Sequence, residues 1–131
     1  MLAVHHPVGP SAGVPFAAIS FAGFVGVVTG FSQTIGMSEK VWETYRTPDV
    51  QPGTYEGMSL VVVIREMLQF GGSRAEAIAI AERAQRTWAV FLGVGGEGSF
   101  SALGYRHASL DVFGAANMST VTNSPDPAVR N

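Results

Sequence analysis

The chain has 131 residues, of which 47% are hydrophobic and 14% charged, and its formal net charge is −2. This length predicts a single domain, and the hydrophobic fraction is sufficient to build a core. No cluster of Lys and Arg is present, which argues against binding to a nucleic-acid backbone. The absence of cysteine excludes disulfides, thiolate zinc sites and a cysteine nucleophile within these residues.

The first fifteen residues form a loop-rich lead-in, with a short strand expected at residues 2–5. Pro7, Gly9 and Pro10 favour a loop after that strand. Because no basic stretch opens the chain, we expect no signal peptide at its amino end. His5 and His6 are adjacent and would point to opposite faces of a strand, so we expect no shared metal ion.

Residues 12–31 contain no charge and have the length of a membrane span. One interpretation is a transmembrane helix that packs through Gly26 and Gly30. The other, which Pro15 and the glycines favour, is sheet structure, because glycine weakens a helix more than a buried strand with close backbone contacts. We therefore predict a strand at 20–29 that forms a hairpin with a return strand at 35–42.

Glu39 is the one acidic residue of the predicted return strand. A partly buried carboxylate needs hydrogen bonds or a cation, or it takes part in chemistry. The alternative is an ordinary solvated or ion-paired strand residue.

Residues 43–57 form a long connection with Thr-Pro-Asp at 47–49 and Gln-Pro-Gly at 51–53. These residues favour turns. A loop of this length either covers a substrate or is a plain surface loop, and both interpretations stay open.

Two adjacent helices follow. Residues 58–70 are apolar around most of the helix circumference, which predicts a largely buried helix that ends at Gly71 and Gly72. Ser73 and Glu76 form a capping box that opens a second helix at 74–86, with small residues such as Ala77 and Ala81 on one face. A face of this kind packs closely on a sheet or on another helix.

The rest of the chain predicts antiparallel strands at 89–94, 99–105, 109–113 and 118–122, with a turn at 95–98. Asn123 follows the last strand and opens an Asn-Ser-Pro segment. Strands on either side of a helical pair predict an α+β domain with the helices on one face of a sheet.

Several short motifs then occur in an informative order. They are Phe-Ala-Gly-Phe-Val-Gly at 21–26, Thr-Gly-Phe at 29–31, Glu39, the helix pair, Leu-Gly-Val-Gly at 92–95, and Val-Thr-Asn ending at Asn123. In this order they resemble the linear amide C–N hydrolases, above all the acid ceramidase-like and N-acylethanolamine acid amidase-like members. The Asn-Ser-Pro segment is more similar to the choloylglycine hydrolase and penicillin acylase branch. The resemblance covers residues 16–125, and 126–131 are a tail.

This resemblance implies part of an αββα N-terminal-nucleophile hydrolase, in which self-cleavage exposes a cysteine whose α-amine acts as its base. It implies an N-acyl amide substrate, which includes N-acyl lipids, and no metal or cofactor. Asn123 matches the asparagine that donates to the tetrahedral oxyanion, a role suited to a neutral donor. Glu39 matches a glutamate that positions groups around the nucleophile. Without the resemblance, Asn123 would be an ordinary turn residue.

The nucleophilic cysteine of this family, with the arginine and aspartate that follow it, would lie upstream of the matched region. The chain therefore resembles either an interior fragment or a degenerate copy, and we expect it to be inactive alone. A half-sandwich would also expose apolar surface that drives self-association. The alternative function is a non-catalytic membrane-associated or binding domain. The family implies a lysosomal or secretory compartment, and the sequence itself leaves the compartment open.

Overall fold

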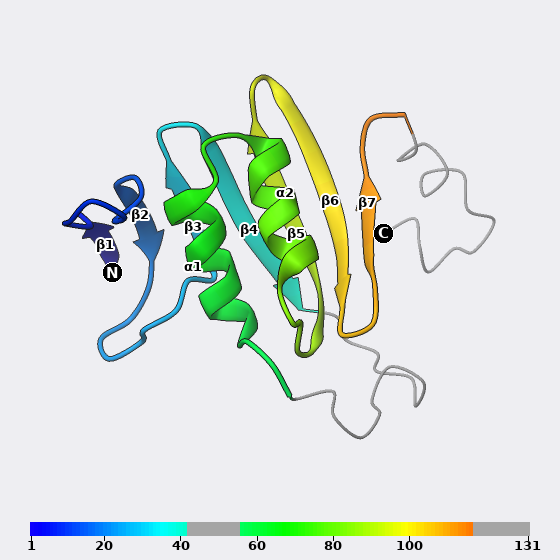
Figure 1. Cartoon of the computed structure of the whole chain (residues 1–131), viewed down its shortest axis with the longest axis horizontal. Coiled ribbons are helices and arrows are strands. Elements are labelled where there is room, and N and C mark those ends of the chain that lie inside the picture. Colours follow the sequence, from blue (N-terminus) through cyan, green and yellow to red (C-terminus); the bar gives the residue numbers. More distant parts are fainter. Residues whose placement is uncertain (42–55, 117–131) are drawn as a thin grey trace.

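The computed structural model describes residues 1–41 and 56–116, which form one antiparallel sheet and a pair of helices (Figure 1). The first four strands are β1 (Leu2–His5), β2 (Phe16–Ile19), β3 (Thr29–Ser32) and β4 (Ile35–Val41). The helices α1 (Leu60–Phe70) and α2 (Arg74–Arg83) come next. The last three strands are β5 (Ala89–Gly96), β6 (Ser99–Arg106) and β7 (Leu110–Phe113).

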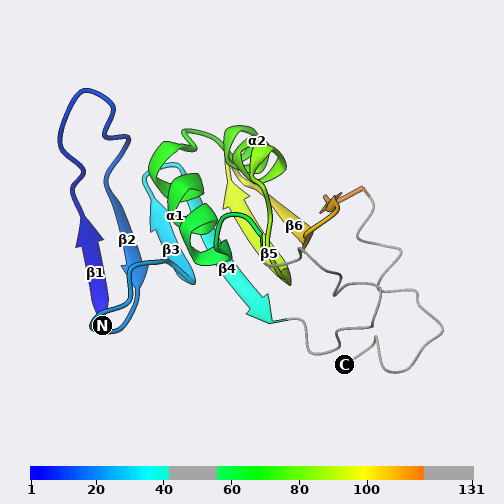
Figure 2. The same ribbon diagram turned by 60° about the horizontal axis from the view of Figure 1, so that its bottom comes forward.

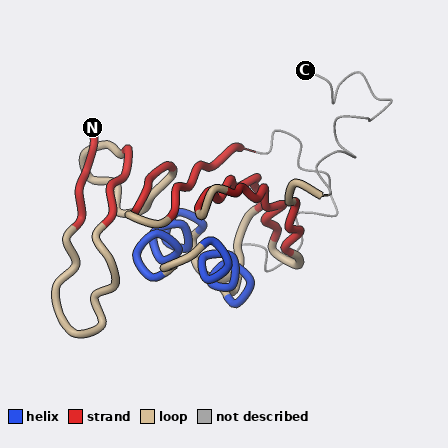
Figure 3. Tube along the Cα trace, turned by 90° about the horizontal axis from the view of Figure 1, so that it is seen from above, coloured by secondary structure: helices blue, strands red, loops and turns tan. Residues whose placement is uncertain are grey.

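Each strand pairs with the next one along the chain, so the order across the seven-stranded sheet is β1 to β7. The helix pair is inserted between β4 and β5, which are themselves antiparallel neighbours. Both helices lie against the same face of the sheet, as the views in Figures 2 and 3 show. The expected α+β arrangement, with antiparallel strands and adjacent helices, is confirmed. In the described part of the chain, no helix covers the opposite face.

The core lies between the helices and the sheet. Strand alternation directs every second side chain toward the helices, and Met37, Leu92 and Leu103 on neighbouring strands are at most 4% exposed. On α1, Ile64 and Met67 are fully buried against them. We call this side of the sheet the covered face and the other side the open face.

The local chemistry of α2 matches the sequence prediction at its start. The Ser73 hydroxyl accepts a hydrogen bond from the Glu76 backbone N–H at 3.2 Å, as a helix N-cap does. Ala77 and Ala81 are fully buried and allow α2 to approach α1 and β5 closely. The helix ends at Arg83, earlier than the expected end at residue 86.

The strand predicted at residues 20–29 is wrong. The strands are β2 and β3, and the glycine-rich segment between them is a loop in which Gly23 has a φ of +85°. This loop packs on α1: the Val27 N–H donates to the Val61 carbonyl at 2.9 Å, and a Cβ at Gly26 would overlap Val61. The glycines therefore serve a close loop contact with a helix. The return strand is confirmed as β4.

No helix in the described ranges is long and apolar enough to cross a membrane. Residues 12–31, the candidate span, contain β2 and most of β3. The short strand at Leu2–His5 is confirmed as β1. The predicted strand at 118–122 and nearly all of the 43–57 connection lie outside the described residues.

Candidate functional site

Glu39 lies on β4 directly opposite Leu92 of β5. It is on the same side of the strand as Met37, so its side chain projects from the covered face near the end of β4. Glu39 is half-buried, and its carboxylate forms no hydrogen bond or ion pair with another described residue. This placement holds Glu39 beside the helix layer rather than on the open face.

Asn123 lies outside the described residues, as do Asn117 and the rest of the chain from there on. The structure therefore does not bring Glu39 and Asn123 together or separate them. The role of each stays a prediction.

The open face carries large apolar side chains in contact with solvent. Its large apolar members that are 40% exposed or more are Leu2, Val4, Ile19, Phe31, Phe91 and Phe100. They extend from β1 to β6, across most of the width of the sheet. The same face also carries the exposed polar residues Ser38 and Lys40 on β4 and the Arg106–Asp111 ion pair of β6 and β7. Exposed apolar surface of this kind is characteristic of a contact with protein, membrane or ligand.

Glycines flatten the middle of the open face. Gly36 and Gly95 are paired across β4 and β5, and Gly36 has no atom within 4 Å of the position that a Cβ would take. The ring of Phe100 lies over Gly93, where a Cβ would be 2.9 Å from the ring. The centre of this face is therefore smooth backbone beside a phenylalanine, which permits a close approach by another main chain.

A polar network fastens the end of α2 to the sheet. The Arg86 guanidinium donates from Nε to the Arg106 carbonyl at 2.8 Å, and from Nη1 to the Ala81 and Glu82 carbonyls at 3.1 and 2.9 Å. The last two carbonyls belong to the final turn of α2, where carbonyl oxygens have no backbone N–H partner within the helix. The ring nitrogen Nδ1 of His107 is 2.7 Å from the Arg86 carbonyl oxygen. Arg86 thus caps the C-terminal end of α2.

Tyr105 is buried beside this network. It is fully buried, and its hydroxyl has no hydrogen-bond partner among the described residues. Burial raises the pKa of Tyr105 to about 12, against a smaller lowering effect from the charge of Arg86. A neutral, deeply buried phenol is suited to packing and not to proton transfer near neutral pH.

Trp88, which immediately precedes β5, has a strained backbone. Its φ is +69°, an uncommon value for a bulky residue. It lines a pocket of about 390 Å³ with Leu60 and Val61 from the start of α1, and the Thr87 hydroxyl donates to the Met58 carbonyl at 3.0 Å beside it. None of the described residues that line this pocket has a titratable side chain.

Among residues 1–41 and 56–116, no cluster of three potential metal ligands occurs. The features that sequence reasoning missed are the Arg86 cap, the strained Trp88 and the buried Tyr105. A basic residue just after a helix is a signal that could have identified the cap. A positive φ at tryptophan leaves no comparable signal in the sequence.

The solved structure of the Caenorhabditis elegans ortholog of N-acylethanolamine-hydrolyzing acid amidase aligns with 86% of this chain, with a TM-score of 0.60 and 14% sequence identity. The aligned region is 51% of that chain, so this protein has the fold of about half of the amidase chain.

Two Dictyostelium discoideum proteins are similar in sequence. Protein dcd1A is 36% identical over 116 residues and protein dcd1B is 39% identical over 103 residues. These matches cover 84% and 77% of this chain but only 25% and 19% of the relatives, so the chain spans about a quarter or less of their length. No protein-family model matches the sequence.

Proposed function

We propose that this sequence forms part of an amide hydrolase of the N-terminal-nucleophile type, which cleaves the linear C–N bond of an N-acyl substrate. The alignment of 86% of the chain with an acid amidase is the observation that carries the proposal. Of the sequence motifs that resemble amide hydrolases, those at 29–31, 39 and 92–95 lie on strands of the sheet, and the motif at 21–26 forms the loop that packs on α1. Motif order and the backbone comparison both support the proposal, although Asn123 lies outside the described residues.

The open face supports the proposal. The αββα sandwich implied by the resemblance packs two sheets face to face, about 10 Å apart, with helices outside. Residues 1–41 and 56–116 form one helix layer and one sheet, and the open face of that sheet carries large exposed apolar side chains on β1, β2, β3, β5 and β6. Roughly half of the amidase chain lies outside the aligned region, which is enough polypeptide for the second pair of layers.

The chemistry requires a cysteine supplied from outside this sequence. Its thiolate sulfur would attack the amide carbonyl carbon and form a tetrahedral intermediate that carries an oxyanion. The Asn123 side-chain N–H would donate to that oxygen, a contribution typically worth about 100- to 1000-fold in rate. Collapse would break the C–N bond, with the amine leaving after it takes a proton, and water would then hydrolyse the acyl-enzyme thioester.

Glu39 has an indirect role in this proposal. Because it projects from the covered face, it would act through β4 and the helix layer as a positioning residue, without touching the substrate. Its carboxylate would place a negative charge at that end of the sheet or accept hydrogen bonds there.

The test joins this sequence, by fusion or co-expression, to a segment that carries the cysteine, arginine and aspartate of the family. Hydrolysis of a fluorogenic N-acyl amide should appear in the assembly and not in the chain alone. Asn123→Ala should lower kcat about 100-fold or more with little change in KM, because an oxyanion donor acts mainly in the transition state. Asn131→Ala, the same chemical change in the predicted tail, should leave both constants unchanged.

Glu39→Gln keeps the shape of the side chain but removes its charge. In the active assembly it should alter the pH dependence of kcat as well as its value. A pH profile identical to that of the parent would remove Glu39 from the proposal and leave Asn123 in it.

A non-catalytic binding domain is the second candidate. It is favoured by the exposed Phe21 and Val25 in the loop between β2 and β3, which are 64% and 74% exposed. An assembly that folds, contains the cysteine and hydrolyses no N-acyl amide would favour this second function.

A further inference from the structure

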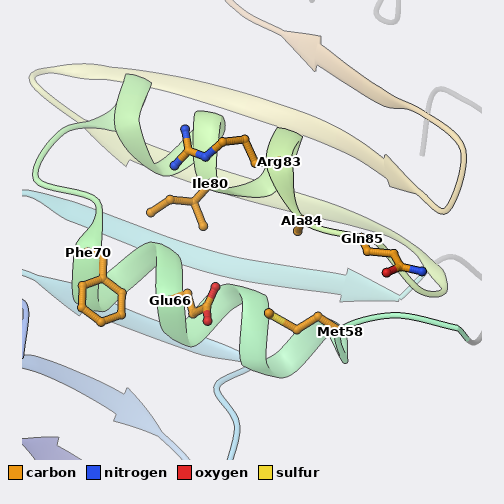
Figure 4. A pocket seen from close by; sticks show the side chains of 7 residues that line it. All are labelled: Met58, Glu66, Phe70, Ile80, Arg83, Ala84 and Gln85. Atoms are coloured by element: carbon orange, nitrogen blue, oxygen red, sulfur yellow. The ribbon is translucent and has the colours of Figure 1, made fainter.

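The outer surface of the helix layer contains a groove between α1 and α2, on the side away from the sheet (Figure 4). Its volume is about 400 Å³. Its lining residues are Met58, Glu66, Phe70, Ile80, Arg83, Ala84 and Gln85. Phe70 is 49% exposed at one end, and Ile80 lies in the middle. This groove is separate from the open face and from Glu39.

Two opposite charges border the groove. Glu66 belongs to α1 and Arg83 to α2. Neither side chain forms an ion pair or hydrogen bond with another described residue. In Figure 4 the Arg83 side chain extends back along α2 beside Ile80, so its guanidinium comes level with the Glu66 carboxylate. The groove thus presents an acid on one wall and a base on the other, above an apolar floor.

From this arrangement we infer that the groove binds a second copy of the same chain, related by a two-fold axis that runs along the groove. Such an axis places α1 of one copy over α2 of the other. A two-fold interface must be self-complementary, so each contact between two different residues occurs twice. Glu66 of each copy then meets Arg83 of the other, and two ion pairs form across the interface.

The apolar residues fit the same axis. Met58 and Ala84 lie at the same end of the groove, on opposite walls. The two-fold places the long Met58 side chain of each copy over the small Ala84 of the other, and Ile80 lies near the axis. Large residues therefore meet small ones, as close packing requires.

A dimer formed through the helix layer leaves the open face available. The proposed amidase needs that face for its second sheet, so both contacts can exist in one molecule. The dimer does not depend on amidase activity, and its failure would leave the proposed function untouched.

The test measures molar mass by light scattering and analytical ultracentrifugation over a concentration series. Ile19→Thr together with Phe31→Thr provides the background, because these changes reduce association through the open face and keep strand-forming residues. In this background the chain should form dimers.

Charge reversal then identifies the interface. Glu66→Arg or Arg83→Glu alone should weaken the dimer about tenfold or more, since each places like charges together twice. The double variant Glu66→Arg/Arg83→Glu should restore the parent affinity. Glu82→Arg, an equal charge change at an exposed α2 residue that does not line the groove, should have little effect.

Circular dichroism checks the fold of each variant. If one single variant is unstable, recovery of the parent dimer affinity by the double variant still decides the test. A monomer at every concentration would overturn the inference. A dimer affinity that neither single charge reversal changes would also overturn it. A double variant that recovers thermal stability without dimerising would also overturn it, because the two side chains would then pair within one molecule.

Discussion

The two faces of the sheet differ although the same strands build both. Phe91 and Leu92 are consecutive on β5, yet Phe91 is 40% exposed on the open face and Leu92 is 1% exposed on the covered face. A strand with one solvated face normally alternates between apolar and polar residues. β5 instead reads Ala-Val-Phe-Leu-Gly-Val-Gly-Gly, with no charged residue. This pattern is typical of a strand buried on both sides, as the proposed sandwich requires of the open face.

The first prediction uses this neighbouring pair and has the largest expected effect. Leu92→Ala should lower the free energy of unfolding by about 2–5 kcal/mol, because it leaves a cavity in the core under the helices. Phe91→Ala should cost about 1 kcal/mol or less in the chain alone, because its ring is already in contact with water. Urea unfolding followed by circular dichroism gives both values. Equal losses would mean that the open face is as tightly packed as the covered one.

The second prediction compares a glycine of the helix contact with a glycine of the open face. A Cβ at Gly26 would overlap the side chain of Val61, a β-branched residue on α1 that cannot easily move aside. Gly26→Ala should therefore cost about 1–3 kcal/mol.

Gly36→Ala is the matched control. No atom lies within 4 Å of its added methyl group, so the free energy of unfolding should change by less than about 0.5 kcal/mol. A costly Gly36→Ala in the chain alone would show that something already covers the open face.

These glycines also show where sequence reasoning succeeded. The first helix, the Ser73 cap and the three strands within residues 89–113 were predicted close to their observed bounds, because periodicity and capping are local signals. The second helix was predicted to run three residues beyond its end at Arg83. The segment around Gly23 and Gly26 was misread as a strand. Its apolar character suits either a buried strand or a loop against a helix, and only the distant partner Val61 decides between them.

The candidate site was less predictable. Glu39 was placed correctly on a half-buried strand, but the side of the sheet to which it projects follows from pairing with Leu92, which is distant in sequence. The Arg86 cap was not predicted, since its acceptors on α2 and β6 become adjacent only in the folded chain. Contacts between remote segments therefore limit what the sequence alone predicts about function.

The third prediction concerns the polar atom buried on the covered face and has the smallest effect at neutral pH. The folded pKa of Tyr105, about 12, is above the ordinary value of 10.0. The folded state therefore binds the phenol proton more tightly than the unfolded state does. The free energy of unfolding should have its full value below pH 10 and fall by roughly 2 kcal/mol as the pH rises toward 12.

Tyr105→Phe should remove this pH dependence and also delete an unpartnered hydroxyl. At neutral pH it should leave stability unchanged or raise it by about 1 kcal/mol. Thermal unfolding across this pH range measures both effects. A large loss of stability at neutral pH would mean that the hydroxyl has a partner in the folded protein.

The central claim is that the open face becomes an interior surface when the hydrolase is complete, and thiol labelling tests it most directly. Because the chain contains no cysteine, Ser38→Cys introduces a single thiol on the exposed, open side of β4. Glu82→Cys on the exposed side of α2 is the control. Peptide mapping by mass spectrometry then reports the labelling rate at each position, in the chain alone and in the assembly with the cysteine-bearing segment. We expect fast labelling at both positions in the chain alone. In the assembly, the labelling rate should fall at least about tenfold at Ser38→Cys only. Equal labelling of Ser38→Cys in an active assembly would contradict it.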